Sequence, residues 1–134
     1  MNGATVRVYS LARNGNEQIT KHFKVREFRC SDGSDTIFIS QELVEVLQKI
    51  RDHFGKPITI NSGYRTDYKN SKTKNAAKES QHRFGLAADI SIRGVSPSRV
   101  AAYAETLLPG TGGIGIYGTF THIDVRATRS RWNG

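Results

Sequence analysis

The sequence has one cysteine, no long apolar run, no internal repeat and no low-complexity tract. Because Cys30 has no second cysteine to pair with, an intramolecular disulfide framework is excluded, and the redox compartment is left open. No apolar run approaches the roughly 18 residues that a membrane helix needs, so we expect no membrane span. The 134 residues predict one domain over 1–134, with residues 1–22 as an N-terminal strand and turn extension. A chain of this size buries roughly two thirds of its surface in a single core.

Acidic residues are few relative to basic ones. Twenty Lys and Arg oppose twelve Asp and Glu, which gives a formal net charge of +8. This surplus favours an anionic partner, such as a nucleic acid, an anionic cell-wall polymer or a membrane surface, without identifying it. Four lysines lie between residues 67 and 79. Neither a recognition-helix pattern nor interleaved aromatic residues accompany them, so we expect no nucleic-acid partner.

Two segments have the pattern of amphipathic helices. Over residues 40–54, apolar residues recur at helical spacing, Ser40 can cap the first turn and Gly55 follows the last one. The second helix begins at Ser96-Pro97, a capping hydroxyl before a proline at the first helical position, and runs to Leu108. Residues 67–79 have little apolar character and predict an exposed loop or a frayed helix.

Alternating or β-branched apolar residues predict strands over 5–11, 58–60, 86–92, 112–117 and 120–126. The last two strands are joined by Gly118-Thr119, a hairpin-type turn. In segment 86–92 the apolar residues share one face and Asp89 lies on the other, which holds a carboxylate on rigid backbone. Together the segments predict an α+β fold, with helices packed on one side of a mostly antiparallel sheet.

Three side chains of the metal-ligating type lie at the predicted turns and strands. His82 precedes a glycine turn that leads into the strand with Asp89, and His122 lies on a later strand that can pair beside it. Two imidazoles and a carboxylate suit zinc, with the fourth tetrahedral position left to water. Zinc polarises a carbonyl and lowers the pKa of bound water to roughly 7, which favours hydrolysis. Single His and Asp residues are usually ordinary polar groups, so the pattern alone leaves both interpretations open.

A longer set of residues carries a family resemblance. Its parts are Ser80-x-His82-x-x-Gly85-x-Ala87-x-Asp89, the upstream segment Ser62-Gly63-Tyr64-Arg65-Thr66 and the later His122. In this order they resemble the signature of the zinc D-alanyl-D-alanine carboxypeptidase family, which includes VanX-like and VanY-like enzymes and phage endolysin peptidases. The resemblance covers roughly Phe23 to the C-terminus and implies a hedgehog/DD-peptidase-like fold.

The resemblance implies zinc bound by His82, Asp89 and His122, and Arg65 in contact with the substrate carbonyl or the oxyanion. The residues support Arg65 independently, because a guanidinium in a tight turn after a strand is a fixed, charged donor, although turn arginines are more often solvated. Family members cleave bonds in peptidoglycan stem peptides, usually next to a D-amino acid. A stem peptide is therefore the expected partner.

Four further residues are predicted substrate contacts. Ser62 and Tyr64 flank Arg65 in the motif, and Ser80 either bonds substrate or caps a local turn. Tyr117, like Trp132, can line a cleft, although aromatic residues of a small domain more often belong to the core.

The sequence departs from the family where a general base is expected. Many members have a carboxylate three residues before the last zinc ligand, where this chain has Thr119. Asp124 is our candidate, either as the base or as a partner that orients a ligand. Glu79 is a weaker candidate, because an ordinary surface carboxylate explains it as well.

These observations favour a monomeric zinc metallopeptidase, either a D,D-carboxypeptidase or an endolysin-type endopeptidase. The alternative is a non-catalytic, zinc-containing module on the same scaffold that binds wall peptide or a protein. We expect action at the bacterial cell wall. The first residues lack the features of a secretory signal, so we expect cytoplasmic synthesis with release by lysis, as for a phage-encoded protein, or a signal that has been removed.

Overall fold

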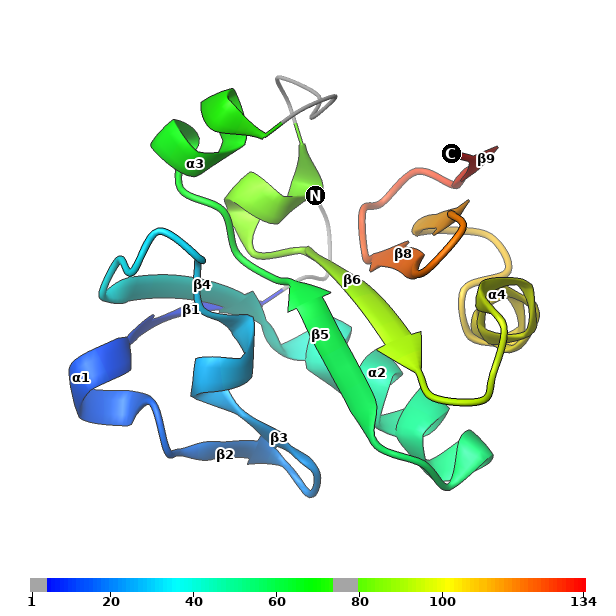
Figure 1. Ribbon diagram of the computed structural model, residues 1–134, viewed down its shortest axis with the longest axis horizontal. Coiled ribbons are helices and arrows are strands. Elements are labelled where there is room, and N and C mark those ends of the chain that lie inside the picture. Colours follow the sequence, from blue (N-terminus) through cyan, green and yellow to red (C-terminus); the bar gives the residue numbers. More distant parts are fainter. Residues whose placement is uncertain (1–4, 74–79) are drawn as a thin grey trace.

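The computed structural model describes residues 5–73 and 80–134 of the chain (Figure 1). Glu79, Lys74 and Lys78, which the sequence analysis named or counted, lie outside this part. The α-helices are α1 (Leu11–Asn14), α2 (Gln41–Phe54), α3 (Asp67–Lys72) and α4 (Pro97–Leu107), and the 3-10 helices are η1 (Val25–Phe28) and η2 (Gln81–Phe84). The strands are β1 (Val6–Ser10), β2 (Gln18–Thr20), β3 (Phe23–Lys24), β4 (Thr36–Ser40), β5 (Ile58–Ser62), β6 (Ala87–Ile92), β7 (Gly113–Ile116), β8 (Thr121–Asp124) and β9 (Ser130–Asn133).

The main sheet has the strand order β5-β6-β8-β7-β9. All of its neighbours pair antiparallel except β7 and β9, which are parallel. Strands β1 and β4 form a separate ladder, and so do β2 and β3. The predicted α+β fold with a mostly antiparallel sheet is confirmed.

The sequence analysis did not find β4 and β9, nor the short strands β2 and β3. Strand β4 runs directly into α2, so the helical pattern that begins at Ser40 hides it. Strand β9 is a four-residue edge strand without buried residues, and its sequence, Ser-Arg-Trp-Asn, does not alternate between apolar and polar. The strand carries little sequence signal because it has no buried face that would require alternating apolar residues.

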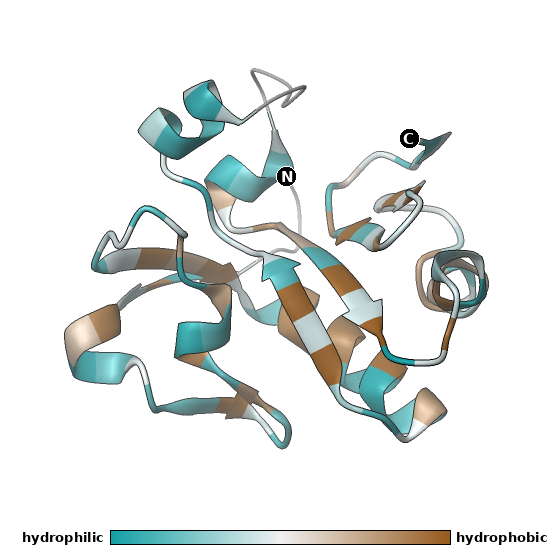
Figure 2. Cartoon of the chain, in the orientation of Figure 1, coloured by the Kyte–Doolittle hydropathy of each residue, from teal (hydrophilic) through white to brown (hydrophobic). Residues whose placement is uncertain are grey.

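Helices α2 and α4 cover one face of the main sheet and form the core with it. Residues of α2, α4, β6, β8 and β7 are buried in one apolar cluster: Leu43, Val44, Leu47, Ile50, Val100, Ala101, Ala104, Ala88, Ile90, Ile92, Ile123 and Ile114. Figure 2 shows the alternation of apolar and polar residues along β5 and β6. Within the described ranges, none of the helices has the length and apolar character needed to cross a membrane.

Both predicted helices have the expected ends. The Ser40 side chain accepts a hydrogen bond from the Leu43 amide at the start of α2, and Gly55 ends that helix in the left-handed conformation. Ser96 caps α4 in the same way as Ser40 caps α2. The segment predicted as a loop or frayed helix contains the short helix α3.

The face of the sheet away from α2 and α4 holds a row of aligned residues. Ser62 pairs with Asp89, Asp89 with His122, His122 with Gly115, and Gly115 with Trp132. Directly opposed residues of neighbouring strands point to the same face. The row therefore gathers side chains with polar groups from four strands, with Gly115 of β7 between them, on the face that does not carry the core.

Gly85 connects η2 to β6 and provides a test of this local geometry. It has a φ of +75°, and a methyl group on it would overlap the backbone carbonyl of Phe38. We expect Gly85→Ala to lower the free energy of unfolding by about 1–2 kcal/mol for the left-handed backbone and about 1–3 kcal/mol more for the overlap. Gly33→Ala is the matched control, because its φ is +85° with open space around it. Urea denaturation measures both, and equal losses would contradict the packing described here.

Candidate metal centre

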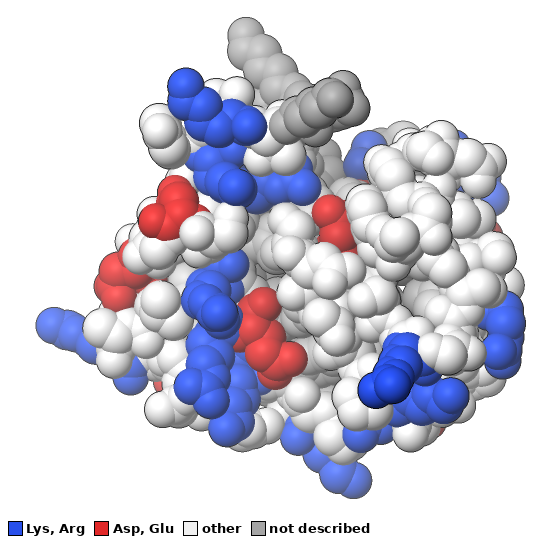
Figure 3. Space-filling model, in the orientation of Figure 1, with Lys and Arg blue, Asp and Glu red and all other residues white. Residues whose placement is uncertain are grey.

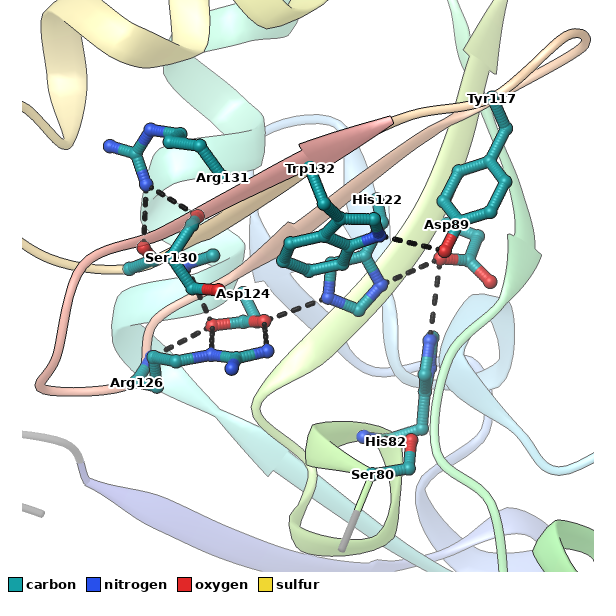
Figure 4. A network of polar contacts seen from close by, with 12 residues as sticks. Ser80, His82, Asp89, Tyr117, His122, Asp124, Arg126, Ser130, Arg131 and Trp132 are labelled. Carbon is teal, nitrogen blue, oxygen red and sulfur yellow. Dashed lines mark hydrogen bonds and ion pairs between the residues drawn. The ribbon is translucent and has the colours of Figure 1, made fainter. Parts of the chain in front are cut away.

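His82, Asp89 and His122 come together in a buried cluster (Figure 4). Each offers one ligand atom, and these atoms all lie within 4.8 Å of one another. Asp89 Oδ1 is 3.0 Å from His122 Nδ1 and 3.3 Å from His82 Nε2. The structure thus brings together the three residues that the sequence predicted as metal ligands.

Two different local structures position these ligands. His82 lies in η2, whose N-cap residue Ser80 accepts from the His82 amide, and Gly85 ends that turn. Asp89 and His122 are directly opposed residues of β6 and β8. A tight turn and two paired strands therefore fix the backbone of all three.

The second nitrogen of each imidazole is held from outside the cluster. His82 Nδ1 is 2.8 Å from the carbonyl oxygen of Gly63, which can only accept, so Nδ1 donates to that oxygen and Nε2 faces Asp89. His122 Nε2 is 2.7 Å from Asp124 Oδ2, which leaves Nδ1 toward Asp89. Metal-binding histidines usually have such a partner, which fixes the tautomer and the ring orientation.

The distances and the donor set fit zinc. Two ligand atoms that each lie about 2.0–2.1 Å from a tetrahedral metal are roughly 3.4 Å apart, and the two contacts of Asp89 Oδ1 are close to this separation. Two imidazole nitrogens and one carboxylate oxygen are ligands that zinc accepts. With three protein ligands, the fourth position is available for water or substrate, as in catalytic sites.

The electrostatics keep Asp89 ionised. Burial raises the pKa of its carboxyl, but hydrogen bonds with His122 and His82 and the charges of these imidazoles outweigh burial, so the pKa lies well below its usual range. For His122, burial lowers the pKa, but Asp124 and Asp89 reverse this effect and raise it above its ordinary value. The cluster therefore presents an anionic oxygen between two oriented imidazoles.

Asp124 is completely buried and fully engaged. Its Oδ1 accepts from the Gly113 amide at 2.8 Å and from Arg126 Nε at 2.9 Å, and its Oδ2 contacts His122 Nε2 and Arg126 Nη2. Burial raises the pKa of Asp124, yet the hydrogen bonds from His122 and Arg126 hold it well below the usual range. A carboxylate so weakly basic and so occupied suits the orienting role better than that of a general base.

Arg65 lies beside Asp89. Its Nη2 is 3.5 Å from Asp89 Oδ2, its Nε donates to Ser62 Oγ at 3.2 Å, and only 13% of its side chain is exposed. Burial lowers the pKa of Arg65 and the negative charge of Asp89 opposes this, so the guanidinium stays charged at neutral pH. Ser62, predicted as a substrate contact, holds Arg65 in place.

The other residues named by the sequence analysis lie outside the cluster of His82, Asp89 and His122. Tyr64 packs its ring 5.0 Å from that of Phe38 at the edge of the core. Ser80 caps η2, the second of the two roles expected for it. Thr119 is exposed in the turn between β7 and β8. Tyr117 joins the site indirectly, because its hydroxyl accepts from Trp132 Nε1 at 2.8 Å.

The sequence analysis gave Arg126 no role in the site and named Trp132 only as a residue that can line a cleft. Arg126 donates a hydrogen bond to the Asp124 carboxylate. The centroid of the Trp132 ring lies 5.0 Å from that of the His122 ring. The sequence does contain a signal for these close contacts, because glycine occupies the alternate positions 113 and 115 of β7. A Cβ at Gly113 would overlap the Asp124 carboxylate, and one at Gly115 would lie 2.5 Å from the Trp132 indole. Glycine at alternate positions of a strand marks a close approach of other groups.

On the face drawn in Figure 3, positive charge is spread over several elements rather than gathered in one groove. In Figure 3 blue side chains occur across the visible face and gather over α3 and η2. Some are paired locally, since Lys72 Nζ lies 5.7 Å from the Tyr68 ring and Arg83 Nε lies 2.9 Å from Asp67. The positive charge on this face is therefore diffuse.

The chain matches a known peptidase family over most of its length. Residues 21–124 match the family model described as peptidase M15. The chain belongs to this family. The predicted resemblance to zinc D-alanyl-D-alanine carboxypeptidases of the VanX and VanY type is thereby confirmed. The matched residues contain the three predicted ligands and Arg65 but end before Arg126 and Trp132.

Several curated proteins are similar to this chain. It is 31% identical over 99 residues to proteins named peptidoglycan L,D-endopeptidase MepK in Escherichia coli strain K12, in Escherichia coli O157:H7 and in Shigella flexneri. The alignment covers 68% of this chain and 53% of each relative. The chain therefore spans about half the length of the curated relatives that it matches.

The contact between Asp124 and His122 predicts an effect on metal affinity. We expect Asp124→Asn to weaken zinc binding by roughly 10–100-fold, because His122 loses the anion that orients its ring. Glu105→Gln is the control, since Glu105 also binds an arginine, Arg131, but lies on α4. Competition with a chromogenic chelator measures both affinities. Equal affinities in the two variants would contradict the orienting contact.

Proposed function

We propose that this protein is a zinc-dependent hydrolase that cuts a peptide bond in bacterial peptidoglycan stem peptides. The observation that carries the proposal is the buried cluster of His82, Asp89 and His122, in which the outer nitrogen of each imidazole has its own partner. Membership of the peptidase M15 family supports hydrolysis of a peptide bond. The name of the MepK relatives supports peptidoglycan as the substrate.

Different residues of the site have different roles in the proposed reaction. When bound by the cluster, zinc supplies a Lewis acid that polarises the scissile carbonyl and activates water. Arg65, held by Ser62 and Asp89, provides a fixed positive charge for the oxygen on which negative charge develops. Asp124 and Arg126 hold the His122 ring, so the ligand geometry is formed before substrate arrives.

Of the two activities that the sequence left open, we propose endopeptidase cleavage. The MepK relatives are named L,D-endopeptidases, whereas D,D-carboxypeptidase activity has no such support. The diffuse positive field suits a polymer whose stem peptides carry carboxylates. We further propose that the protein acts at the cell wall and as a monomer.

Cleavage of defined muropeptides tests this function directly. We expect the protein to bind about one zinc ion and to cut a stem peptide, and His82→Ala to lose both metal and cleavage. His53→Ala is the matched control, because His53 stacks on Tyr103 away from the cluster and should leave both unchanged. Mass spectrometry of the products, with zinc-loaded and chelated protein, identifies the bond and separates L,D- from D,D-cleavage.

The possible results separate the competing functions. Cleavage that persists in His82→Ala would exclude the proposed site. Zinc bound in the expected ratio without turnover of any muropeptide would favour the non-catalytic module, in agreement with Thr119 at the position where many family members have a carboxylate.

Arg65 predicts a loss of rate without a loss of metal. We expect Arg65→Gln to lower kcat by about 100-fold, because one donor to the developing oxyanion is removed, while zinc content stays at one. Arg99→Gln is the control, since Arg99 is exposed on α4 beside Phe54. Steady-state kinetics with metal analysis measures both effects. An unchanged kcat, or a loss of zinc in Arg65→Gln, would contradict this role.

A further inference from the structure

The hydroxyl group of Tyr117 lies near the cluster of His82, Asp89 and His122. Its contact with Trp132 shows whether the hydroxyl donates or accepts a hydrogen bond there. Tyr117 follows β7, and Trp132 lies in β9, beyond the residues that match the family model. The indole Nε1 of Trp132 donates to the Tyr117 hydroxyl oxygen at 2.8 Å (Figure 4). This bond joins the residue that follows β7 to a residue of β9.

Trp132 is fixed next to a metal ligand. Its ring lies 5.0 Å from the His122 ring and occupies the space over Gly115, whose missing side chain makes room for it. Arg126 packs on the indole, with its Cζ 5.5 Å from the ring centroid. The residue that positions Tyr117 is thus packed against the same arginine that clamps Asp124.

The direction of the hydrogen bond determines what the Tyr117 hydroxyl can do. An indole nitrogen donates and cannot accept, so the phenolic oxygen must be the acceptor. The Tyr117 hydroxyl proton is then directed elsewhere. In residues 5–73 and 80–134, no acceptor for that proton forms a hydrogen bond with it. A partly buried hydroxyl with one lone pair used and its proton unused is suited to donate to a ligand.

The phenol is held on the side of the site where Arg65 and Asp89 lie. Its ring stacks on Phe120, with 4.4 Å between centroids and 11° between planes. Arg65 lies beside Asp89, with its Nη2 3.5 Å from Asp89 Oδ2. In Figure 4 the Tyr117 side chain extends toward Asp89.

We propose that Tyr117 donates a hydrogen bond to the scissile carbonyl oxygen as negative charge develops on it, and that Trp132 is the positioning residue that aims this hydroxyl. The inference rests on the proposed peptidase function. No bond to hydrogen is broken in this role, since the proton remains on the phenol. Arg65 and Tyr117 then approach the same oxygen, one as a cation and the other as a neutral donor.

Tyr117→Phe removes the donor and keeps the ring. We expect kcat to fall by about 100-fold, with KM within twofold and zinc content unchanged, because the hydrogen bond strengthens only as charge develops. A phosphinate stem-peptide analogue, which is tetrahedral and anionic, should bind more weakly by a similar factor in calorimetry. Tyr68→Phe is the matched control, because Tyr68 is exposed on α3 and should leave both quantities unchanged.

Trp132→Phe tests the positioning role, since it removes the N–H and keeps an aromatic ring over Gly115. We expect a fall in kcat of about 10-fold. The double variant Tyr117→Phe, Trp132→Phe should be no slower than Tyr117→Phe alone, because the tryptophan acts through the hydroxyl. Multiplying effects in the double variant would instead assign Trp132 a separate, structural role and would overturn the positioning argument.

The remaining outcomes distinguish the inference from the proposed function. If the unmodified protein cuts muropeptides while Tyr117→Phe keeps kcat and analogue affinity within twofold, the inference is wrong and the peptidase function stands. If Tyr117→Phe loses zinc or unfolds at lower urea concentration than Tyr68→Phe, the hydroxyl is structural and the inference is also wrong. If the unmodified protein cuts no muropeptide, the peptidase function and this inference fail together.

Discussion

The pairing of β6 with β8 is the constraint on which the candidate metal centre depends. It sets Asp89 directly opposite His122, although 33 residues separate them in the chain. A shift by one residue would turn one of these side chains toward the apolar core under α2 and α4. The core itself prevents such a shift, because Ile90 and Ile123 are fully buried on the opposite face. Apolar packing on one face of the sheet therefore fixes the polar chemistry on the other.

A buried polar network is stable only if its charges have partners. Here Asp89 lies between two imidazoles and Arg65, and Asp124 accepts two hydrogen bonds from the Arg126 side chain. The negative charges that burial would otherwise destabilise are each matched by a nearby donor. The same contacts leave His82 Nε2 and His122 Nδ1 facing Asp89, so the interactions that satisfy the buried charges also arrange the ligand atoms.

The last strand of the sheet completes the site from outside the family match. Strand β9 pairs with β7 and lays Trp132 over Gly115, beside His122. The glycines of β7 are therefore part of the site even though they have no side chain, because they make room for Asp124 and Trp132. The Asp124 carboxylate and the Trp132 ring fill the space that side chains at Gly113 and Gly115 would otherwise occupy.

The sequence by itself determined the elements whose signal is local. Helix α2 begins after Ser40 and ends before Gly55, as predicted. The alternation in 86–92 correctly predicted that Asp89 lies on the face opposite the apolar residues. The predicted ligand set came from the residue types at the predicted turns and strands and from the family resemblance, and the structure brings these three residues together. Only the tertiary structure decided which atoms meet: Asp124 contacts the outer nitrogen of His122, and Tyr64 packs on Phe38. The reason is physical, since spacing along a chain specifies helices and strand faces, whereas strand order, register and the path of a polar edge strand depend on packing between distant segments.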